Sequence, residues 1–450
     1  MENRTFLKKI NKSLLCVATV LSLAVSGCGG SAKNNNDNDF IIDLGNTSAD
    51  PEVAQTVDLF LSWYLWPDEL PSLNAENFSS VDEVVNTVTS AVERDRFSFW
   101  LPRDIGEAFF FSGELVGYGG HVKFTDDAVI ILFTHNNGAF ADNNLQRGDR
   151  IVSVDGESVA TLLEEAQANG LSDSSIFGAQ QEGTSVTATV ERLGGLSEQI
   201  TLTSSTYSIN AVIAEEVIPQ GDSTVGYIAY SDFLDTSEPE LEATFEQFKA
   251  AGVDQLVLDL RYNGGGSLSI TAKLASWING SFGGQLFTGT NYNDARADSD
   301  QDYFFDSFEN SLSIQNLVVI ATSATCSASE AIVAGFEPYI NVTVVGQTTC
   351  GKPVGMNLFT FDNVMLAPLT FQLSNSEGLL EYFSGISPDC SVADSDTIHA
   401  LGDSEEAMLS AALNYLSTGQ CSANAGLAKS SSQARGYSSL RSPAFSNMVD

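Results

Sequence analysis

Ser327 stands where a buried strand is expected to pass into a helix. The apolar run 317–321 leads through small polar residues to Ser327, and a helical stretch from Ser329 to Phe336 follows at once. A side chain in this position meets the dipole and the unpaired N–H groups of a helix N-terminus, which favour a developing negative charge. Ser327 could therefore serve as a nucleophile. A serine followed three residues later by a glutamate is also typical of helix capping, and local sequence alone favours capping.

Lys352 is a candidate for the base that such a serine needs. It is the only lysine or arginine between Arg296 and Lys429, and it lies between a glycine and a proline just past an expected buried strand. A lysine has a pKa of about 10.4 in water, so it accepts a proton near neutral pH only when burial lowers that pKa. A segment without other cations and enclosed by apolar strands could provide that burial. A general depletion of lysine would explain the gap without any chemistry.

The third candidate is the glycine run Gly264-Gly265-Gly266, which follows the expected buried strand 255–260. Glycines permit positive φ and let backbone N–H groups come close to a ligand. A flexible turn is the alternative, but the charged pair Asp259 and Arg261 before the glycines favours an anchored loop. Neither a phosphate-loop nor a dinucleotide-binding pattern surrounds these glycines.

The elements expected around these residues divide the chain into six segments. Residues 206–421 alternate strands with helices, which predicts an α/β (α+β) domain with a mixed, partly parallel sheet. Residues 106–205 indicate a β-rich module, and residues 50–105 a small helical unit. The remaining segments are a signal peptide over 1–27, a flexible tether over 28–49 and a Ser-rich tail over 422–450 that we expect to be disordered.

The N-terminus has the layout of an export signal. Basic residues precede an apolar run that is too short for a comfortable membrane-spanning helix, and small residues lead directly to Cys28. The tetrad Val25-Ser26-Gly27-Cys28 resembles a bacterial lipobox, which would make Cys28 the lipidated first residue of the exported chain. We therefore expect the periplasmic face of the cell envelope, with the outer membrane favoured and membrane contact only through the lipid. A plain signal peptide with an incidental cysteine is the alternative.

Composition narrows the classes of partner. With 17% charged and 43% hydrophobic residues the chain is an ordinary globular protein, but its formal net charge is -38. So few cations make nucleic acid an unsuitable partner, and the acidic side chains indicate a soluble, salt-adapted surface. The cysteines outside the export segment are even in number, which suggests disulfides in an exported protein, and no CxxC pair indicates zinc. Three connectivities are open to Cys326, Cys350, Cys390 and Cys421.

Taken together, the three candidate stretches resemble the carboxyl-terminal processing, or tail-specific, proteases of serine peptidase family S41, over about residues 50 to 420. In that family a Ser-Ala-Ser-Glu motif supplies the nucleophile through its first serine, which matches Ser327, and a lysine in a later Gly-Lys turn is the base, which matches Lys352. The resemblance implies a Ser-Lys dyad with no metal or organic cofactor. It also implies an oxyanion hole formed by the N–H of Ala328 and that of Gly265 or Gly266.

The β-rich module fits the same family, whose members carry a PDZ domain. Gly117-Tyr118-Gly119-Gly120 resembles the PDZ carboxylate-binding loop, and the strand after it could pair with an extended peptide. Residues 145–151 resemble the Leu-x-x-Gly-Asp signature of the family. The resemblance thus implies an exported serine endopeptidase that holds protein or peptide substrates by their C-termini while the dyad cuts.

One position near the lysine departs from the pattern of the family. The family usually has a glutamine four residues after the lysine, where this chain has Met356, and Asn357 is a candidate for the missing orienting group. Cys326 and Cys350 flank the two catalytic turns, so a disulfide between them would tie these turns together and leave Cys390 to pair with Cys421.

Other functions remain open at this stage. A peptide-binding scaffold that captures C-termini without cutting is compatible with Met356, and a structural envelope lipoprotein is compatible with the acidic surface. Within an enzyme, His399 is the only plausible histidine base, since His121 and His135 lie in the β-rich module.

Overall fold

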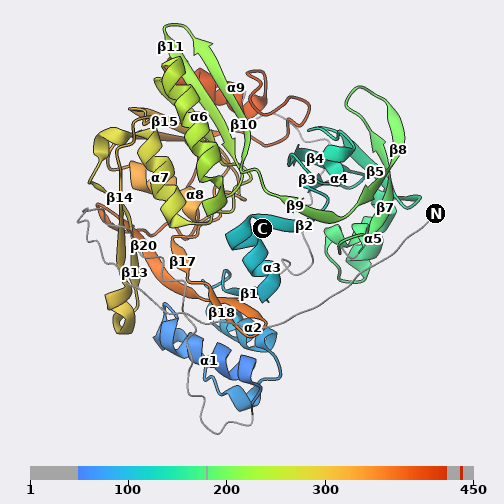
Figure 1. The fold of residues 1–450 in the computed structure, drawn as a ribbon, viewed down its shortest axis with the longest axis vertical. Coiled ribbons are helices and arrows are strands. Elements are labelled where there is room, and N and C mark those ends of the chain that lie inside the picture. Colours follow the sequence, from blue (N-terminus) through green and yellow to red (C-terminus); the bar gives the residue numbers. More distant parts are fainter. Residues whose placement is uncertain (1–48, 179–180, 423–435, 439–450) are drawn as a thin grey trace, which may run out of the picture. The chain divides into compact units, whose positions relative to one another are not determined.

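The computed structural model describes residues 49–178, 181–422 and 436–438 (Figure 1). The expected signal peptide, Cys28 and all but the last residue of the expected tether lie outside the described residues. Within the described ranges, no helix has both the length and the apolar character needed to cross a membrane.

The N-terminal unit is built on two capped helices, α1 (Pro51–Trp63) and α2 (Val81–Ala91). Asp50 accepts a hydrogen bond from the N–H of Glu52 and so caps α1, while Ser80 caps α2. Both helices bury apolar faces against a three-stranded sheet with the order β1-β19-β18. Its strands are β1 (Phe99–Pro102), β18 (Phe359–Phe361) and β19 (Val364–Ala367). This unit is therefore completed by strands from much later in the chain.

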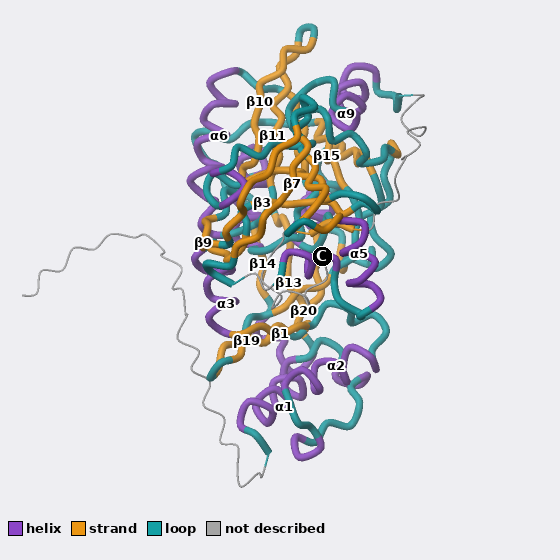
Figure 2. The backbone as a smooth tube through the Cα atoms, turned by 90° about the vertical axis from the view of Figure 1, so that its right-hand side faces the viewer, coloured by secondary structure: helices purple, strands orange, loops and turns teal. Residues whose placement is uncertain are grey.

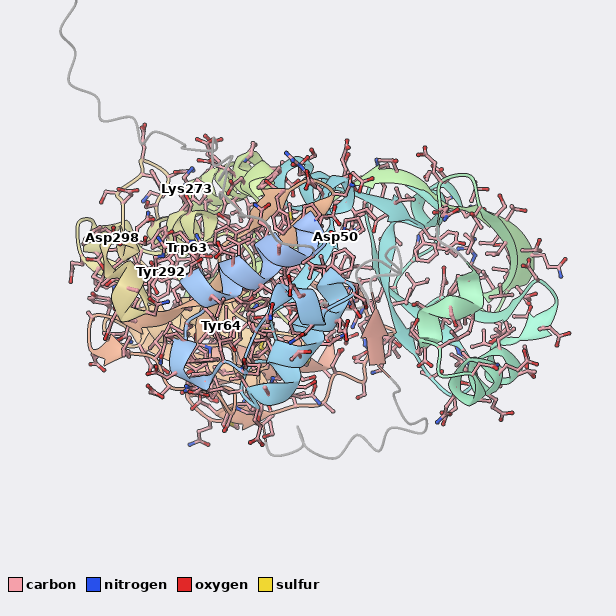
Figure 3. The ribbon with its side chains drawn as sticks, turned by 90° about the horizontal axis from the view of Figure 1, so that it is seen from below. Asp50, Trp63, Tyr64, Lys273, Tyr292 and Asp298 are labelled. Atoms are coloured by element: carbon pink, nitrogen blue, oxygen red, sulfur yellow. A yellow bond between two sulfur atoms is a disulfide. The ribbon has the colours of Figure 1, made fainter. Side chains whose placement is uncertain are left out.

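A second contact joins the same unit to another sheet, which has the order β14-β13-β20-β17. Trp63 at the end of α1 packs edge to face against Tyr292, with ring centroids 6.1 Å apart (Figure 3). The strands of this sheet are β13 (Leu286–Tyr292), β14 (Gln301–Phe304), β17 (Val354–Met356) and β20 (Leu369–Asn375), with β21 (Gly378–Leu379) beside β20.

The expected β-rich module is present, with a sheet of order β23-β3-β4-β5-β7-β8 and a separate β2-β9 pair. Helix α5 (Val159–Ala168) packs Val159 and Leu163 into its core. The module also contains α4 (Ala139–Asp142), and its strands are β2 (Glu114–Gly117), β3 (Gly120–Phe124), β4 (Val129–Thr134), β5 (Arg150–Val154), β6 (Glu157–Ser158), β7 (Ser185–Glu191), β8 (Ser197–Thr203) and β9 (Ser205–Ser208).

The outermost strand of that sheet, β23 (Gly436–Ser438), comes from the C-terminal tail. We expected residues 422–450 to be disordered, but these three residues pair with β3. The sequence pattern missed the strand because its partner lies more than 300 positions away along the chain, where no local signal can indicate it.

The central sheet is six-stranded, with the order β10-β11-β12-β15-β16-β22. All its neighbouring pairs are parallel except β10 with β11, which confirms the predicted mixed, partly parallel α/β sheet. The strands are β10 (Val212–Gln220), β11 (Ser223–Tyr230), β12 (Gln255–Asp259), β15 (Asn316–Ala321), β16 (Asn341–Gly346) and β22 (Cys390–Ser391).

Helices cover both faces of this sheet, because successive strand residues point to opposite sides. Leu256 and Leu258 share one core with α6 (Glu238–Ala251), α7 (Leu268–Ile278) and α8 (Ala328–Phe336). Val257, between them, faces the core that contains α9 (Ala407–Thr418). Figure 2 shows α6 and α9 on opposite sides of the strands. The sheet is thus the middle layer of three, and its buried strands end at the candidate loops.

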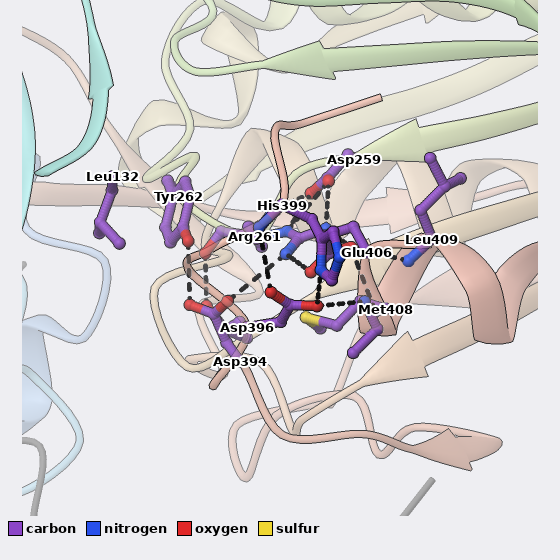
Figure 4. Close-up of polar contacts among 12 residues, drawn as sticks. Leu132, Asp259, Arg261, Tyr262, Asp394, Asp396, His399, Glu406, Met408 and Leu409 are labelled. Carbon is purple, nitrogen blue, oxygen red and sulfur yellow. Dashed lines mark hydrogen bonds and ion pairs between the residues drawn. The ribbon is translucent and has the colours of Figure 1, made fainter. Parts of the chain in front are cut away.

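A buried arginine holds the end of β12. The side chain of Arg261 is only 1% exposed, and its guanidinium donates to Asp259 Oδ2 at 2.7 Å and to Glu406 Oε1 at 2.8 Å (Figure 4). Glu406 also caps α9 by accepting from the N–H groups of Met408 and Leu409. The anchoring role expected for the charged pair Asp259 and Arg261 is therefore seen in the structure, and its far end is the last helix.

The same cluster includes Asp394, which links the central sheet to the β-rich module. Asp394 accepts from Tyr262 Oη at 3.0 Å, and Arg147 of the module donates to that tyrosine oxygen at 3.0 Å. Burial by itself would raise the pKa of Asp394, but the charges of Arg261, Arg147 and Lys123 hold it below its usual value.

Arg261→Met should lower the free energy of unfolding by about 3–5 kcal/mol, because it leaves buried carboxylates without their cation. Chemical denaturation followed by fluorescence or circular dichroism measures this change. Lys273→Met is the matched control, since Lys273 pairs with Glu238 where both side chains are about a third exposed or more, and its loss should cost less than about 1 kcal/mol. Equal losses for the two variants would contradict the anchoring role.

Candidate active site

Ser327 lies in the turn between β15 and α8, as the sequence indicated, and it is the residue directly before the helix. Its backbone has φ 57° and ψ -114°, a conformation that is strained for a residue with a side chain. Strain of this kind persists only where surrounding contacts impose it, and it is concentrated at functional sites. The turn therefore presents the serine in an orientation that capping alone does not require.

Glu330 supplies the contacts that impose this turn. Its carboxylate is fully buried, and its Oε2 accepts hydrogen bonds from the N–H of Ser327 at 2.9 Å and from the N–H of Lys352 at 2.9 Å. Its other oxygen, Oε1, accepts from the N–H of Gly351 at 2.8 Å and from the Thr349 hydroxyl. Because one oxygen binds both backbone nitrogens, the nitrogens of Ser327 and Lys352 can be no further apart than twice 2.9 Å.

Burial raises the pKa of Glu330, and the four hydrogen bonds that it accepts oppose this effect. The sequence analysis treated Glu330 only as part of a possible helix cap. Its link to residues 349–352 could not be found by a local signal, since these positions come after another strand.

A disulfide makes a second link between the same two turns. Cys326, directly before the serine, is bonded to Cys350, two residues before the lysine, with Cα atoms 5.2 Å apart. Cys390 is bonded to Cys421. This is the pairing that the sequence analysis preferred. Although the two sulfurs of the first bond lie close to Glu330, they are joined to each other and do not form a pair of thiolate ligands for a metal.

The side chain of Lys352 lies against the N-terminal unit. Its Nζ is 5.2 Å from the centroid of the Phe97 ring, and among the described residues it makes no hydrogen bond or ion pair. Burial lowers the pKa of Lys352 to about 8, while the nearby carboxylates of Asp95 and Glu330 act in the opposite direction. A neutral amine is therefore accessible close to physiological pH.

Residues 95–98 form the wall behind this amine. Asp95 is 1% exposed and is itself fixed by Tyr64 Oη at 2.8 Å and by the N–H of Ser98 at 2.8 Å. Arg96 donates to the carbonyl oxygen of Cys350, so the wall is also bonded to the lysine turn. The sequence analysis placed these residues only within the small helical unit 50–105, because nothing local connects them with a lysine some 250 positions later.

Asn357, the candidate orienting group, is bonded elsewhere. Its side-chain oxygen accepts from Thr370 Oγ1 at 2.7 Å and from Tyr292 Oη at 3.0 Å, and it makes no contact with the lysine amine. Met356 is a partly buried apolar residue in the adjacent cores. In this structure the lysine amine lies 5.2 Å from the centroid of the Phe97 ring, and Asp95 acts on it through its charge.

The glycine loop packs directly on the serine turn. At Gly265, which has φ +107°, a Cβ would lie only 2.9 Å from Ser327 Cβ, so no larger residue fits there. Asn263 fixes the loop: its Oδ1 accepts from the N–H of Gly265 at 2.8 Å and from Ser329 Oγ at 2.9 Å. The second serine of the Ser-Ala-Ser-Glu motif thus joins the helix to the loop.

The backbone N–H groups around the serine differ in whether they already have a hydrogen-bond acceptor. The N–H of Gly265 is bonded to Asn263. The N–H groups of Ala328 and Gly266 have no acceptor in the described part of the chain, whereas the N–H of Gly265 is already bonded.

The remaining candidates lie away from the serine turn. His399 pairs through Nδ1 with Asp396 Oδ2 at 2.8 Å, and its carbonyl accepts from Arg147. In the β-rich module, Gly117 to Gly120 connect β2 to β3, with Gly119 at φ +83°. The N–H groups of Tyr118 and Gly119 have no acceptor within the described ranges, as a carboxylate-binding loop would require.

Comparison with known proteins finds a matching peptidase family and related processing proteases. Residues 224–392 match the family described as Peptidase family S41. The chain is 26% identical over 290 residues to a carboxyl-terminal-processing protease of Synechocystis sp., covering 63% of each chain. It is 22% identical over 293 residues to the carboxy-terminal processing protease CtpA of Bacillus subtilis, covering 64% of this chain and 59% of the relative. The matched part is thus less than two thirds of either relative's length.

Among solved structures, a Bacteroides fragilis chain named for the S41 proteases has a similar fold. The TM-score is 0.66 with 22% sequence identity, and the likeness covers 81% of this chain and 97% of that one.

In Glu330→Gln the NH₂ of the amide replaces one carboxylate oxygen, and an NH₂ group cannot accept a hydrogen bond. Each backbone N–H that faces this NH₂ loses its acceptor, which should lower the free energy of unfolding by about 1–3 kcal/mol. Because either oxygen of the glutamate serves the lysine turn, we also expect faster amide hydrogen exchange at residues 349–352. Glu337→Gln, at the other end of the same helix, is exposed and should change neither quantity. Unchanged exchange in Glu330→Gln would show that the carboxylate does not hold the two turns together.

Proposed function

Since residues 224–392 match the model of peptidase family S41, we propose that the chain is a serine endopeptidase with Ser327 as its nucleophile and Lys352 as its general base. The observation that carries this proposal is the single carboxylate oxygen of Glu330, which accepts from the backbone N–H of both residues. A helix cap would need only the first of these bonds. The second bond brings a lysine with a lowered pKa to a serine with a strained backbone.

In the first step, the neutral amine of Lys352 takes the proton of Ser327 Oγ while Oγ attacks the scissile carbonyl carbon. The carbonyl oxygen becomes an oxyanion, which accepts hydrogen bonds from the N–H groups of Ala328 and Gly266. Both donors are unused in the described structure, and the dipole of α8 points its positive end at the same place. The oxyanion hole of the proposal is therefore Ala328 with Gly266, and Gly265 serves to bring the loop against the serine.

The tetrahedral intermediate then collapses. The C–N bond breaks, the ammonium of Lys352 gives its proton to the leaving amine, and an acyl-enzyme on Ser327 remains. The lysine, neutral again, takes a proton from water as the water attacks the ester, and it returns this proton to Ser327 Oγ when the acid product leaves. No step needs a metal or an organic cofactor.

We further propose that the β-rich module presents substrates in the manner of a PDZ domain. The loop 117–120 offers the unused N–H groups of Tyr118 and Gly119 to a terminal carboxylate, and β3 follows it directly. An extended peptide can pair with the edge of β3 while its C-terminus lies in the loop. The partners proposed are accordingly proteins or peptides with accessible C-termini.

The proposal also includes export of the chain and the segment boundaries that the sequence predicted. In it, residues 1–27 are a signal peptide, Cys28 carries the lipid, and the folded part works at the periplasmic face of the envelope, with the outer membrane favoured. Two disulfides among the described residues are compatible with an oxidising compartment.

Ser327→Ala should abolish cleavage of an unfolded protein substrate, and Lys352→Arg should do the same, because an arginine stays protonated and cannot accept the serine proton. Fragments are followed by gel electrophoresis and mass spectrometry, with circular dichroism as the check on folding. Ser323→Ala, an exposed serine of the same turn, is the control and should keep full activity. If the unaltered chain binds such substrates but produces no fragments, it is a peptide-binding scaffold and not a protease.

The value of kcat/KM should rise with pH, with a midpoint at about 8. The amine of Lys352 can accept a proton only when it is neutral, and it is mostly neutral when the pH exceeds its pKa of about 8. Asp95 raises this pKa, so Asp95→Asn should move the midpoint to lower pH. Asp302→Asn, at an exposed aspartate, should leave it in place. A midpoint that moves to higher pH in Asp95→Asn, or does not move, would rule out Lys352 as the group that titrates.

A further inference from the structure

The chain's own C-terminal tail occupies the free edge of the β-rich module. Strand β23 pairs antiparallel with β3, with Gly436 opposite Phe124, Tyr437 opposite Lys123 and Ser438 opposite Val122. In the sheet order β23-β3-β4-β5-β7-β8, β3 would be the edge strand without it. An exposed edge strand offers unpaired N–H and C=O groups to any extended chain, and here residues 436–438 take that place.

We propose that this tail is an intramolecular ligand of the β3 edge, which competes with substrate C-termini for the same backbone groups. The inference rests on the proposed function, because it takes the β3 edge as the substrate-binding edge. It adds that the edge is already occupied in the resting chain, so that a substrate must displace the tail before it can be presented to Ser327.

The direction of the strand agrees with such competition. β3 begins at Gly120, immediately after the loop 117–120. Going from Gly436 to Ser438, the tail moves from Phe124 toward Val122, and therefore toward that loop. A peptide that puts its C-terminus into the loop must run along β3 in the same direction. The tail and a substrate would thus use the same edge in the same orientation and could not bind together.

The charge of the tail also suits this role. Residues 423–450 contain three basic residues and one acidic residue, whereas the chain as a whole carries a formal net charge of -38. The three are Lys429, Arg435 and Arg441, and two of them flank the paired segment closely in sequence. A basic segment is attracted to an acidic body at moderate ionic strength, and the attraction weakens as salt screens it.

A covalent link keeps the tail close to its binding edge. The Cys390–Cys421 disulfide ties the start of the tail to β22 of the central sheet. Only 14 residues separate Cys421 from Gly436. A tether of this length gives the bound segment an effective concentration on the order of millimolar, so even weak strand pairing competes with a dilute substrate.

The occupied edge lies next to the central sheet's anchor. Lys123, opposite Tyr437 in the pairing, donates through Nζ to the carbonyl oxygen of Asp394 at 2.7 Å. Asp394 belongs to the buried cluster around Arg261, two residues after the end of β12. A strand on β3 is therefore held against the side of the module that faces the catalytic part of the chain.

The first experiment measures binding, with Ser327→Ala in every protein so that no probe is cut. The probe is a fluorescein-labelled peptide with the sequence of residues 431–442, followed by fluorescence anisotropy. A chain that ends at Ser422 should bind the probe about tenfold more tightly or better than the full chain, because its β3 edge is vacant. Equal affinity for the two proteins would overturn the inference, as would no binding to the shortened chain.

Hydrogen exchange shows whether β3 is the strand concerned. The amides of residues 122–124 should exchange faster in the shortened chain and should regain protection when the peptide is added. The variant Tyr437→Pro/Ser438→Pro should behave like the shortened chain, because successive N–H groups point to opposite sides of a strand and one of the two must face β3. Ala444→Pro/Phe445→Pro, outside the paired segment, should behave like the full chain. Protection of residues 122–124 that is independent of the tail would contradict the proposal.

Activity gives a separate readout with Ser327 restored. Removing the tail should lower KM for an unfolded protein substrate severalfold and leave kcat unchanged, and raised salt should narrow the difference. Binding and exchange are measured on an inactive serine variant, so they decide the role of the tail even if the chain cleaves nothing. Conversely, cleavage that depends on Ser327 but has the same KM with and without the tail would keep the enzyme and reject the competition.

Discussion

The candidate site depends on one buried carboxylate. Glu330 is on the first turn of α8, yet three of its four hydrogen bonds go to residues 349–352, which follow the next strand. A buried carboxylate that is left without partners costs several kcal/mol of stability. Conformations that keep both turns bonded to Glu330 are therefore strongly favoured. The strained serine backbone and the position of the lysine turn are consequences of the same set of bonds. The Cys326–Cys350 disulfide duplicates the link covalently.

Around this point, separate parts of the chain each meet one requirement of a hydrolytic site. The central sheet brings the serine turn and the glycine loop together at the ends of the neighbouring strands β12 and β15. The N-terminal unit contributes Phe97, whose ring centroid lies 5.2 Å from the lysine Nζ, and Asp95, whose charge raises the pKa that burial lowers. The buried Arg261 fixes the end of β12 against α9. The proposed base needs a dry environment, and the N-terminal unit covers the turn near position 350.

The β-rich module is joined to this arrangement by polar contacts and by an apolar cluster in which Leu132 and Phe133 of β4 pack against Tyr262. Arg147 and Lys123 reach Tyr262 and Asp394, which belong to the cluster at the end of β12. In the proposed function this module accepts and releases peptide strands, and the strand that it holds in this structure is part of the chain's own tail.

Sequence alone determined the features that depend on local pattern. The apolar runs predicted β12 and β15, the small polar residues after β15 predicted the start of α8, and the three motifs singled out Ser327, Lys352 and the glycine loop. Periodicity and glycine placement are encoded within a few residues, so they can be read without a fold.

What only the tertiary structure decided are the contacts between distant segments. The order of the strands in space explains the double use of Glu330, the position of Phe97 beside the lysine amine and the bonding of Asn357 to Thr370. It also explains why the N–H of Gly265 is bonded to Asn263. The pairing of β23 with β3 is the extreme case. A strand edge accepts almost any extended backbone, so the identity of its occupant is set by proximity and tethering, which no local pattern records.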